Sequence, residues 1–188
     1  MDAVSGGLGN VRILVLEDNQ HMRAIILTIL GGVGIRDVRE SPDSLSAIRI
    51  MREHPVDIAL VDFQLSGMDG VEFTRQVRRS PISPDPFLPI IMITGHSERA
   101  RVEEARDAGV TEFVAKPLTA RALLARIEAV IFRPRPFIRC ATYFGPDRRR
   151  RSDPNYAGAA RRSTDMRAPA DLDDDFILTP VSPAGARR

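Results

Sequence analysis

The sequence predicts an α/β fold, a doubly wound, five-stranded parallel sheet with helices on both faces. Two observations predict it. Short, mainly apolar runs alternate five times with helical patterns between residues 11 and 132, and strands that are apolar throughout are typical of a parallel sheet buried on both sides. Each helical pattern is also long enough to form the right-handed crossover that joins two parallel strands.

The first two strands each lead into a helix. Residues 11–16 form an apolar run that ends in acids, and apolar residues then recur at helical spacing until Gly31-Gly32. A short strand at residues 37–40 precedes Ser41-Pro42, which suit an N-cap and a first helical position. We therefore expect the second helix to run from Ser41-Pro42 to about His54.

The third strand is the next buried run, at residues 56–61. A loop at residues 66–70 follows it, and a helix through Phe73 and Val77 comes next. Four prolines then interrupt the chain before another strand can begin, and they are Pro81, Pro84, Pro86 and Pro89.

The last two strands and helices complete the alternation. Residues 90–93 form the fourth strand and a polar helix spans roughly residues 98–108. A brief fifth strand at residues 112–115 precedes the final helix, whose apolar stripe extends from Leu123 to Ile131.

The composition argues against a secreted or membrane-spanning protein. The single cysteine, Cys140, excludes an internal disulfide framework. The chain has no apolar stretch long enough to span a bilayer and no basic-then-apolar N-terminus. We therefore expect a cytoplasmic location and no membrane insertion.

The charge changes sign along the chain. From Arg133 onward there are 12 Arg and 7 Asp, a net charge of +5, whereas the preceding residues carry 15 basic and 18 acidic side chains, a net charge of −3. No apolar period continues beyond Arg133, and such a segment buries too little apolar surface to offset its chain entropy. We expect a flexible N-terminus at residues 1–10, a folded domain at 11–132 and a largely disordered tail at 133–188.

Polar residues stand at the carboxyl ends of four predicted strands. Glu17-Asp18 follow the first strand, Asp62 the third, Thr94 the fourth and Lys116 the fifth. Ligands of doubly wound sheets bind at this edge, so we expect these side chains to converge. Lys116 is also the only lysine among 27 basic residues, which points to a specific role for its compact ammonium group.

Three convergent carboxylates favour a bound cation. With oxygen ligands and no His or Cys cluster, Mg²⁺ fits best, because it prefers a few carboxylates together with water and phosphate oxygens. A phosphate beside the ion would be stabilised by the Lys116 ammonium and the Thr94 hydroxyl. Asp62 would then be the available nucleophile.

These residues resemble the receiver domain of bacterial two-component response regulators over about residues 11–132. The matching positions are, in chain order, Glu17-Asp18, Asp62, Gly70, Thr94 and Lys116-Pro117. The resemblance implies a flavodoxin-like fold, as in stand-alone chemotaxis regulators. It also implies a phosphorelay response regulator, a phosphoprotein that acts as a conformational switch rather than as an enzyme.

The resemblance implies a role for each residue. The implied Mg²⁺ ligands are Glu17, Asp18, Asp62 and the backbone carbonyl of Gln64. Lys116 would contact the phosphoryl group, and its bond to Pro117 would be cis. Thr94 and Phe113 would form the switch, while Gln64 and His96 would flank the attacking water and tune hydrolysis.

The implied partners are a histidine kinase or a histidine phosphotransfer protein, which would donate the phosphoryl group, and a downstream protein. The downstream protein would bind the face built from the fourth and fifth helices. Two residues depart from the family pattern. Ser66 stands where receivers often carry Pro, so we expect the same loop with slightly more freedom, and Phe113 lacks the hydroxyl of the common Tyr.

Simpler explanations compete with these roles. Asp62 could cap the next helix, and Glu17-Asp18 could be an ordinary acidic turn. Thr94 could be purely structural and Phe113 simply part of the core. An Asp-nucleophile phosphatase is disfavoured, because Gln64 cannot act as the general acid expected two residues after the nucleophile.

The tail suggests an alternative function. The pattern Tyr-x-Gly-x-x-Arg-Arg occurs at residues 143–149 and again at 156–162, which is either a repeated recognition element or a coincidence of composition. A nucleic-acid-binding regulator could act through this basic tail with the receiver as a modulator. No recognition helix accompanies the arginines, so a solvated tail is the simpler expectation.

Overall fold

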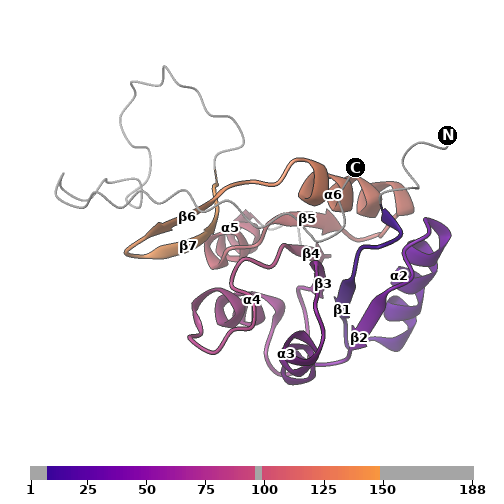
Figure 1. The fold of residues 1–188 in the computed structure, drawn as a ribbon, viewed down its shortest axis with the longest axis horizontal. Coiled ribbons are helices and arrows are strands. Elements are labelled where there is room, and N and C mark those ends of the chain that lie inside the picture. Colours follow the sequence, from indigo (N-terminus) through magenta and orange to yellow (C-terminus); the bar gives the residue numbers. More distant parts are fainter. Residues whose placement is uncertain (1–7, 96–98, 149–188) are drawn as a thin grey trace, which may run out of the picture.

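The computed structural model describes residues 8–95 and 99–148 and has the predicted doubly wound architecture (Figure 1). Its five parallel strands are β1 (Ile13–Leu16), β2 (Val38–Ser41), β3 (Ile58–Asp62), β4 (Ile90–Thr94) and β5 (Glu112–Ala115). The helices are α2 (Gln20–Gly32), α3 (Ser44–Glu53), α4 (Gly70–Arg79), α5 (Arg99–Ala108) and α6 (Ala120–Phe132). The sheet order is β2-β1-β3-β4-β5, the flavodoxin-like order, so the predicted fold class is confirmed.

Helices cover both faces of the sheet because successive strand residues point to opposite sides. In β1, Ile13 and Val15 belong to one apolar cluster, which also contains residues of α2 and α6. Leu14 and Leu16 belong to a second cluster, which contains residues of α3 and α4. All four strand residues are buried. The predicted two-sided burial therefore holds along this strand.

Side-chain caps set where the helices begin. Each of four N-caps accepts a hydrogen bond from a backbone N–H in the first turn, and these residues are Asn19, Asp43, Asp69 and Thr119. The prediction that Ser41 caps the second helix is wrong. Ser41 pairs with Leu16 as the last residue of β2, and Asp43 caps α3 by accepting from the N–H of Ser46.

The strand register brings the carboxyl ends of the central strands together. Leu16 pairs with Val61, Asp62 pairs with Ile93, and Thr94 pairs with Ala115. The residues that end or follow β1, β3, β4 and β5 therefore lie along one edge of the sheet, as the topology predicted.

A β-hairpin follows the last helix. Its strands are β6 (Phe137–Cys140) and β7 (Tyr143–Pro146), and β7 contacts α4 and α5 (Figure 1). The rings of Phe137 and Phe144 lie 5.2 and 5.1 Å from the ring of Phe87, measured between centroids. The guanidinium of Arg78 lies 5.0 Å from the centroid of the Phe137 ring.

The hairpin corrects the prediction that the chain loses its structure from Arg133 onward, which is wrong for residues 133–148. Phe137, Tyr143 and Phe144 are buried, and this apolar surface stabilises the segment. The first Tyr-x-Gly pattern has a packing role, because Gly145 lies against Gly109 and a Cβ on Gly145 would approach the Cα of Gly109 to 2.9 Å. The second pattern and the predicted disorder of 149–188 lie outside the described residues, as do residues 1–7 of the N-terminus that was predicted to be flexible over residues 1–10. That prediction is wrong for Leu8, which is buried in the apolar cluster that contains residues of α2 and α6.

None of the helices in the described part of the chain is long and apolar enough to cross a membrane.

Candidate functional site

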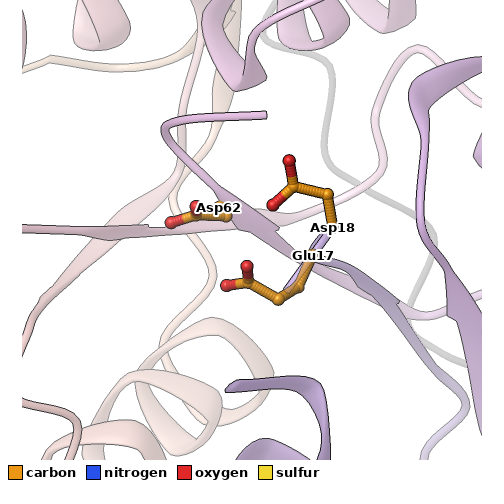
Figure 2. A group of neighbouring side chains, drawn as sticks. All are labelled: Glu17, Asp18 and Asp62. Carbon is orange, nitrogen blue, oxygen red and sulfur yellow. The ribbon is translucent and has the colours of Figure 1, made fainter. Parts of the chain in front are cut away.

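Three carboxylates gather at the carboxyl edge of the sheet (Figure 2). Glu17 and Asp18 come from the turn after β1, and Asp62 is the last residue of β3. One oxygen from each lies within 4.8 Å of the others. Glu17 and Asp62 are buried, whereas Asp18 is partly exposed. The predicted convergence of the three acids is present in the structure.

Lys116 brings the positive charge to this cluster. Its Nζ lies 2.8 Å from Oδ1 of Asp62 and 3.5 Å from Oε2 of Glu17. The Lys116 side chain remains 26% exposed, while the two carboxylates are nearly inaccessible. The lysine therefore contacts the acids while part of its side chain remains accessible to solvent.

Burial and the neighbouring charges act on the pKa values of Asp62, Glu17 and Lys116. Burial raises the pKa of Asp62, and the hydrogen bond and charge of Lys116 offset part of that rise. Burial also raises the pKa of Glu17, and the nearby charge of Asp62 raises it further. Burial lowers the pKa of Lys116, but its interactions with Asp62 and Glu17 outweigh this effect, so the pKa is raised overall.

Asp18 is held by Ser66, a residue that the sequence analysis noted only because it differs from the family pattern. The backbone N–H and the hydroxyl of Ser66 both donate to Oδ2 of Asp18, at 2.9 and 2.5 Å. The Ser66 hydroxyl is the main cause of the lowered pKa of Asp18. These bonds connect the loop after β3 to the turn after β1. The sequence analysis expected slightly more freedom in this loop and did not predict the contact.

The fourth and fifth strands place the remaining predicted residues beside the cluster. Thr94 ends β4 and is 6% exposed. The backbone N–H of Lys116 donates to the Thr94 carbonyl at 2.8 Å, which fixes the spacing of the two strand ends. The Lys116-Pro117 peptide bond is cis, as the resemblance implied.

Gly70 is required by the close approach of α4 to the end of β3. A Cβ at this position would lie 2.2 Å from the carbonyl oxygen of Asp62, and the Gly70 N–H donates to the Phe63 carbonyl at 3.1 Å. A side chain here would push against the backbone of Asp62 itself. The first helical turn therefore packs directly on the proposed nucleophile's main chain.

The remaining predicted residues differ in their exposure and in whether the structure describes them. Phe113 is partly buried in β5 and packs against a cluster that includes Met92. Gln64 is exposed in the loop after β3. His96 lies outside the described residues. The alternative that Asp62 caps α4 is wrong, because Asp69 is the N-cap.

The donor set fits a hard divalent cation. All three convergent side chains offer carboxylate oxygen, the ligand type that Mg²⁺ prefers. Oε2 of Glu17 is buried and has no hydrogen-bond partner among the described residues, so it is available to a metal. Among the ion pairs of the described residues, those of Lys116 reach these carboxylates, whereas the nearby Arg23 guanidinium donates to the backbone carbonyls of Glu17 and Asp18. A cation would relieve the remaining repulsion.

Comparison with known proteins places the chain among receiver domains. The sequence model described as response regulator receiver domain matches residues 13–128. The chemotaxis protein CheY of Pseudomonas aeruginosa is 32% identical over 123 residues, which cover 65% of this chain and 98% of that protein.

Solved structures give the same result. The chemotaxis protein CheY4 of Vibrio cholerae superposes with a TM-score of 0.59 at 25% identity, covering 64% of this chain and 98% of that one. The receiver domain of the sensor histidine kinase PA1611 from Pseudomonas aeruginosa, described with a magnesium ion coordinated in its active site cleft, superposes with a TM-score of 0.56 at 28% identity. That match covers 63% of this chain and 94% of that domain.

Proposed function

Because the chain belongs to the response regulator receiver domain family, we propose that it is a phosphorelay switch that accepts a phosphoryl group on Asp62. The observation that carries the proposal is the 2.8 Å contact between Lys116 Nζ and Asp62 Oδ1 within a cluster of three carboxylates. This is the arrangement that phosphoryl transfer requires, a nucleophile beside a fixed positive charge.

Glu17, Asp18 and Asp62 would hold Mg²⁺, together with the backbone carbonyl of Gln64. The magnesium ion in the cleft of the PA1611 receiver domain supports this choice of metal. When bound, the ion neutralises charge that develops on the phosphoryl oxygens. Oε2 of Glu17 is buried and accepts no hydrogen bond among the described residues, and the nearest cation, Lys116, lies 3.5 Å away, so this oxygen would gain from such a partner.

In the proposed reaction, a carboxylate oxygen of Asp62 attacks the phosphorus of a phosphohistidine. The new O–P bond forms as the N–P bond breaks, and the imidazole nitrogen keeps the electron pair of that bond and takes up a proton. Lys116 would stabilise the transferred group from its position beside Asp62, and Thr94 at the end of β4 would donate its hydroxyl to a phosphoryl oxygen.

The phosphorylated state would be read at a distance from Asp62. Thr94 and Phe113 would move together, and the face formed by α5, β5 and α6 would present the change to a downstream protein. Gln64 and His96 would tune the lifetime of the acyl phosphate by steering or excluding water. In this proposal the chain is a switch and not an enzyme.

The proposed donor is a histidine kinase or a histidine phosphotransfer protein, and the proposed compartment is the cytoplasm. The rival nucleic-acid function gains no support from the described part of the tail. There Arg148 is held within the domain, by an ion pair of 3.1 Å with Asp107 and by the Tyr143 ring at 4.0 Å.

Incubation with phosphoramidate and Mg²⁺, followed by measurement of the intact mass, tests the proposal without the cognate kinase. The wild-type chain should gain one phosphoryl group, and Asp62→Asn should gain none. Asp69→Asn is the matched control, because Asp69 lies in the same loop but caps α4. Phosphorylation of the Asp62→Asn variant at the wild-type rate would refute the assignment.

A further inference from the structure

A separate cavity of about 260 Å³ lies between α5, β5 and the segments on either side of the hairpin. Three arginines are among its lining residues, which are Val102, Arg106, Thr111, Phe113, Arg135 and Arg148. The residues of the carboxylate cluster do not line it. The switch candidate Phe113 does, so this cavity lies beside the route by which the receiver would signal.

The three arginines share an unusual feature. The Nε atoms of Arg106, Arg135 and Arg148 are all buried and have no hydrogen-bond partner among the residues that the structure describes. A buried N–H without a partner costs free energy, and one such group attached to a positive charge costs more. All three arginines line the same cavity, although their Nε atoms are inaccessible to solvent in this conformation, so a ligand there would reach these N–H groups only after a shift of the guanidinium groups.

The arginines are positioned by contacts that use their other nitrogens. Oδ1 of Asp107 lies 3.1 Å from Nη1 of Arg148 and 3.5 Å from Nη2 of Arg106. Arg135 donates from Nη2 to the carbonyl of Thr111. Arg106 and Arg148 thus share the single carboxylate of Asp107, and Arg135 bonds to a neutral carbonyl. The three arginines that line the cavity therefore carry more positive charge than this one carboxylate balances.

We propose that this cavity is an oxyanion-binding site that takes a phosphate or carboxylate group. Guanidinium N–H groups match the geometry of such oxygens and are less strongly hydrated than an ammonium, which suits a partly buried site. The side chains of Val102 and Phe113 would contact the apolar part of a larger ligand. The site does not depend on phosphorylation of Asp62.

Two of the three arginines lie beyond the family match. That match ends at residue 128, whereas Arg135 and Arg148 flank the hairpin on its two sides. Arg106 comes from α5, within the matched region. The hairpin therefore completes the site by bringing two of its three cations to the face that carries Phe113.

Two sources could supply the oxyanion. One is a free molecule that bears a phosphate group. The other is the chain itself, because residues 171–175 contain four Asp and begin 23 positions after Arg148. If the intervening residues are disordered, as their composition predicts, they would have a root-mean-square span of roughly 25–30 Å. Tethering would give this segment an effective concentration on the order of millimolar.

The experiment monitors the Nε–Hε signals of the arginines by NMR in the ¹⁵N-labelled full chain. Two variants are compared with the wild type. In the first, Asp171, Asp173, Asp174 and Asp175 are all changed to Asn, and in the second, Asp153 and Asp165 are changed as the matched control. The signal of Arg12 serves as the internal reference, because its Nε already donates to Asp57 at 2.9 Å.

Inorganic phosphate should shift the signals of Arg106, Arg135 and Arg148 saturably in the four-Asn chain and leave Arg12 in place. Arg135→Ala in the same chain should weaken the apparent phosphate affinity roughly tenfold or more. If the acidic segment is the natural occupant, the wild type and the control variant should differ from the four-Asn chain before phosphate is added, and they should need more phosphate.

If a free phosphate-bearing molecule is the natural occupant, all three chains should respond to phosphate alike. Either pattern supports the site and identifies the source. The proposal is overturned if phosphate causes no saturable shift of the three signals and the four-Asn chain also matches the wild type. It is equally overturned if Arg135→Ala leaves the phosphate response unchanged.

Discussion

Lys116 Nζ lies 2.8 Å from Asp62 Oδ1 and thereby links β5 to β3, two strands that are separated by β4 in the sheet. The contact is possible because all three strands are parallel and end at the same edge. The lysine partly compensates the buried carboxylate of Asp62, whose pKa remains raised. In the Mg²⁺-free protein, the ionised carboxylate of Asp62 therefore destabilises the folded state.

The first prediction follows from the raised pKa of Glu17, which burial causes. A carboxyl group with a raised folded-state pKa binds its proton more tightly in the folded chain, so the Mg²⁺-free protein should lose stability as pH rises from the ordinary value of 4.5 through the raised value. Glu17→Gln should remove this contribution and make the metal-free protein more stable at neutral pH. Urea unfolding with a chelator across that pH range measures it.

The same variant should lose most of the stabilisation that Mg²⁺ gives the wild type, which is about 2.7 kcal/mol at a hundredfold excess over Kd. Glu53→Gln is the control, since Glu53 is exposed at the end of α3 and far from β1 in sequence. An Mg²⁺ response in Glu17→Gln equal to that of the wild type would show that Glu17 is not a ligand.

The second prediction concerns Ser66 and Asp18. Ser66→Ala removes the hydroxyl that donates to Asp18 Oδ2 at 2.5 Å, so the pKa of Asp18 should rise toward its ordinary value. The stability lost should be about 0.5–1.5 kcal/mol at neutral pH. The loss should shrink as pH falls through the lowered pKa of Asp18, where the wild type also loses the contribution.

Carboxyl ¹³C shifts recorded against pH measure the Asp18 titration directly. Ser46→Ala is a matched control, because its hydroxyl donates to Asp43 at 2.8 Å in a similar capping interaction away from the site. If the Asp18 titration is the same in Ser66→Ala and in the wild type, the hydroxyl does not set its pKa.

The third prediction concerns Gly70. Gly70→Ala would place a Cβ 2.2 Å from the Asp62 carbonyl oxygen, so α4 or the end of β3 must shift. We expect a stability loss of about 1–3 kcal/mol and slower phosphoryl transfer to Asp62. Gly31→Ala in α2 is the control, because a Cβ there meets nothing within 4 Å and should be neutral or stabilising. Equal stability of the two variants would contradict the packing.

The fourth prediction concerns the hairpin. The full chain, a chain ending at Arg148 and a chain ending at Arg133 are compared. The chain ending at Arg133 should be at least about 2 kcal/mol less stable than the one ending at Arg148, because it lacks the buried rings of Phe137 and Phe144. Both truncated chains keep all residues of the carboxylate cluster. Denaturant unfolding of the three chains measures the difference, and indistinguishable midpoints would mean that the hairpin contributes nothing to the fold.

Sequence patterns were sufficient for the sheet and the site because both depend on topology. Parallel apolar strands must end at one edge of the sheet, so the sequence was enough to predict that Asp62, Thr94 and Lys116 lie at the same edge. The cis bond at Lys116-Pro117 followed from the family resemblance and is also present.

The features that the sequence did not reveal depend on contacts between distant residues. Ser66 meets Asp18 across 48 positions, and no local pattern marks that bond. The hairpin is stabilised by Phe87, which is 50 residues before Phe137 in the sequence. Phe87 lies in the proline-rich segment that the sequence analysis interpreted only as an interruption before the fourth strand. Because residues 133–148 are rich in Arg and Pro, the composition predicted disorder. The three aromatic side chains that stabilise this segment, Phe137, Tyr143 and Phe144, do not follow a strand or helix period.

The site of phosphorylation is the most direct test of the central claim. After incubation with phosphoramidate and Mg²⁺, borohydride reduction converts an aspartyl phosphate into homoserine, which peptide mass spectrometry can locate. We predict homoserine at position 62, dependent on Mg²⁺, and none at Asp18 or Asp69, with no reduction of Glu17 to the corresponding five-carbon amino alcohol. Modification at another residue, or none at position 62 while the protein remains folded, would contradict the account.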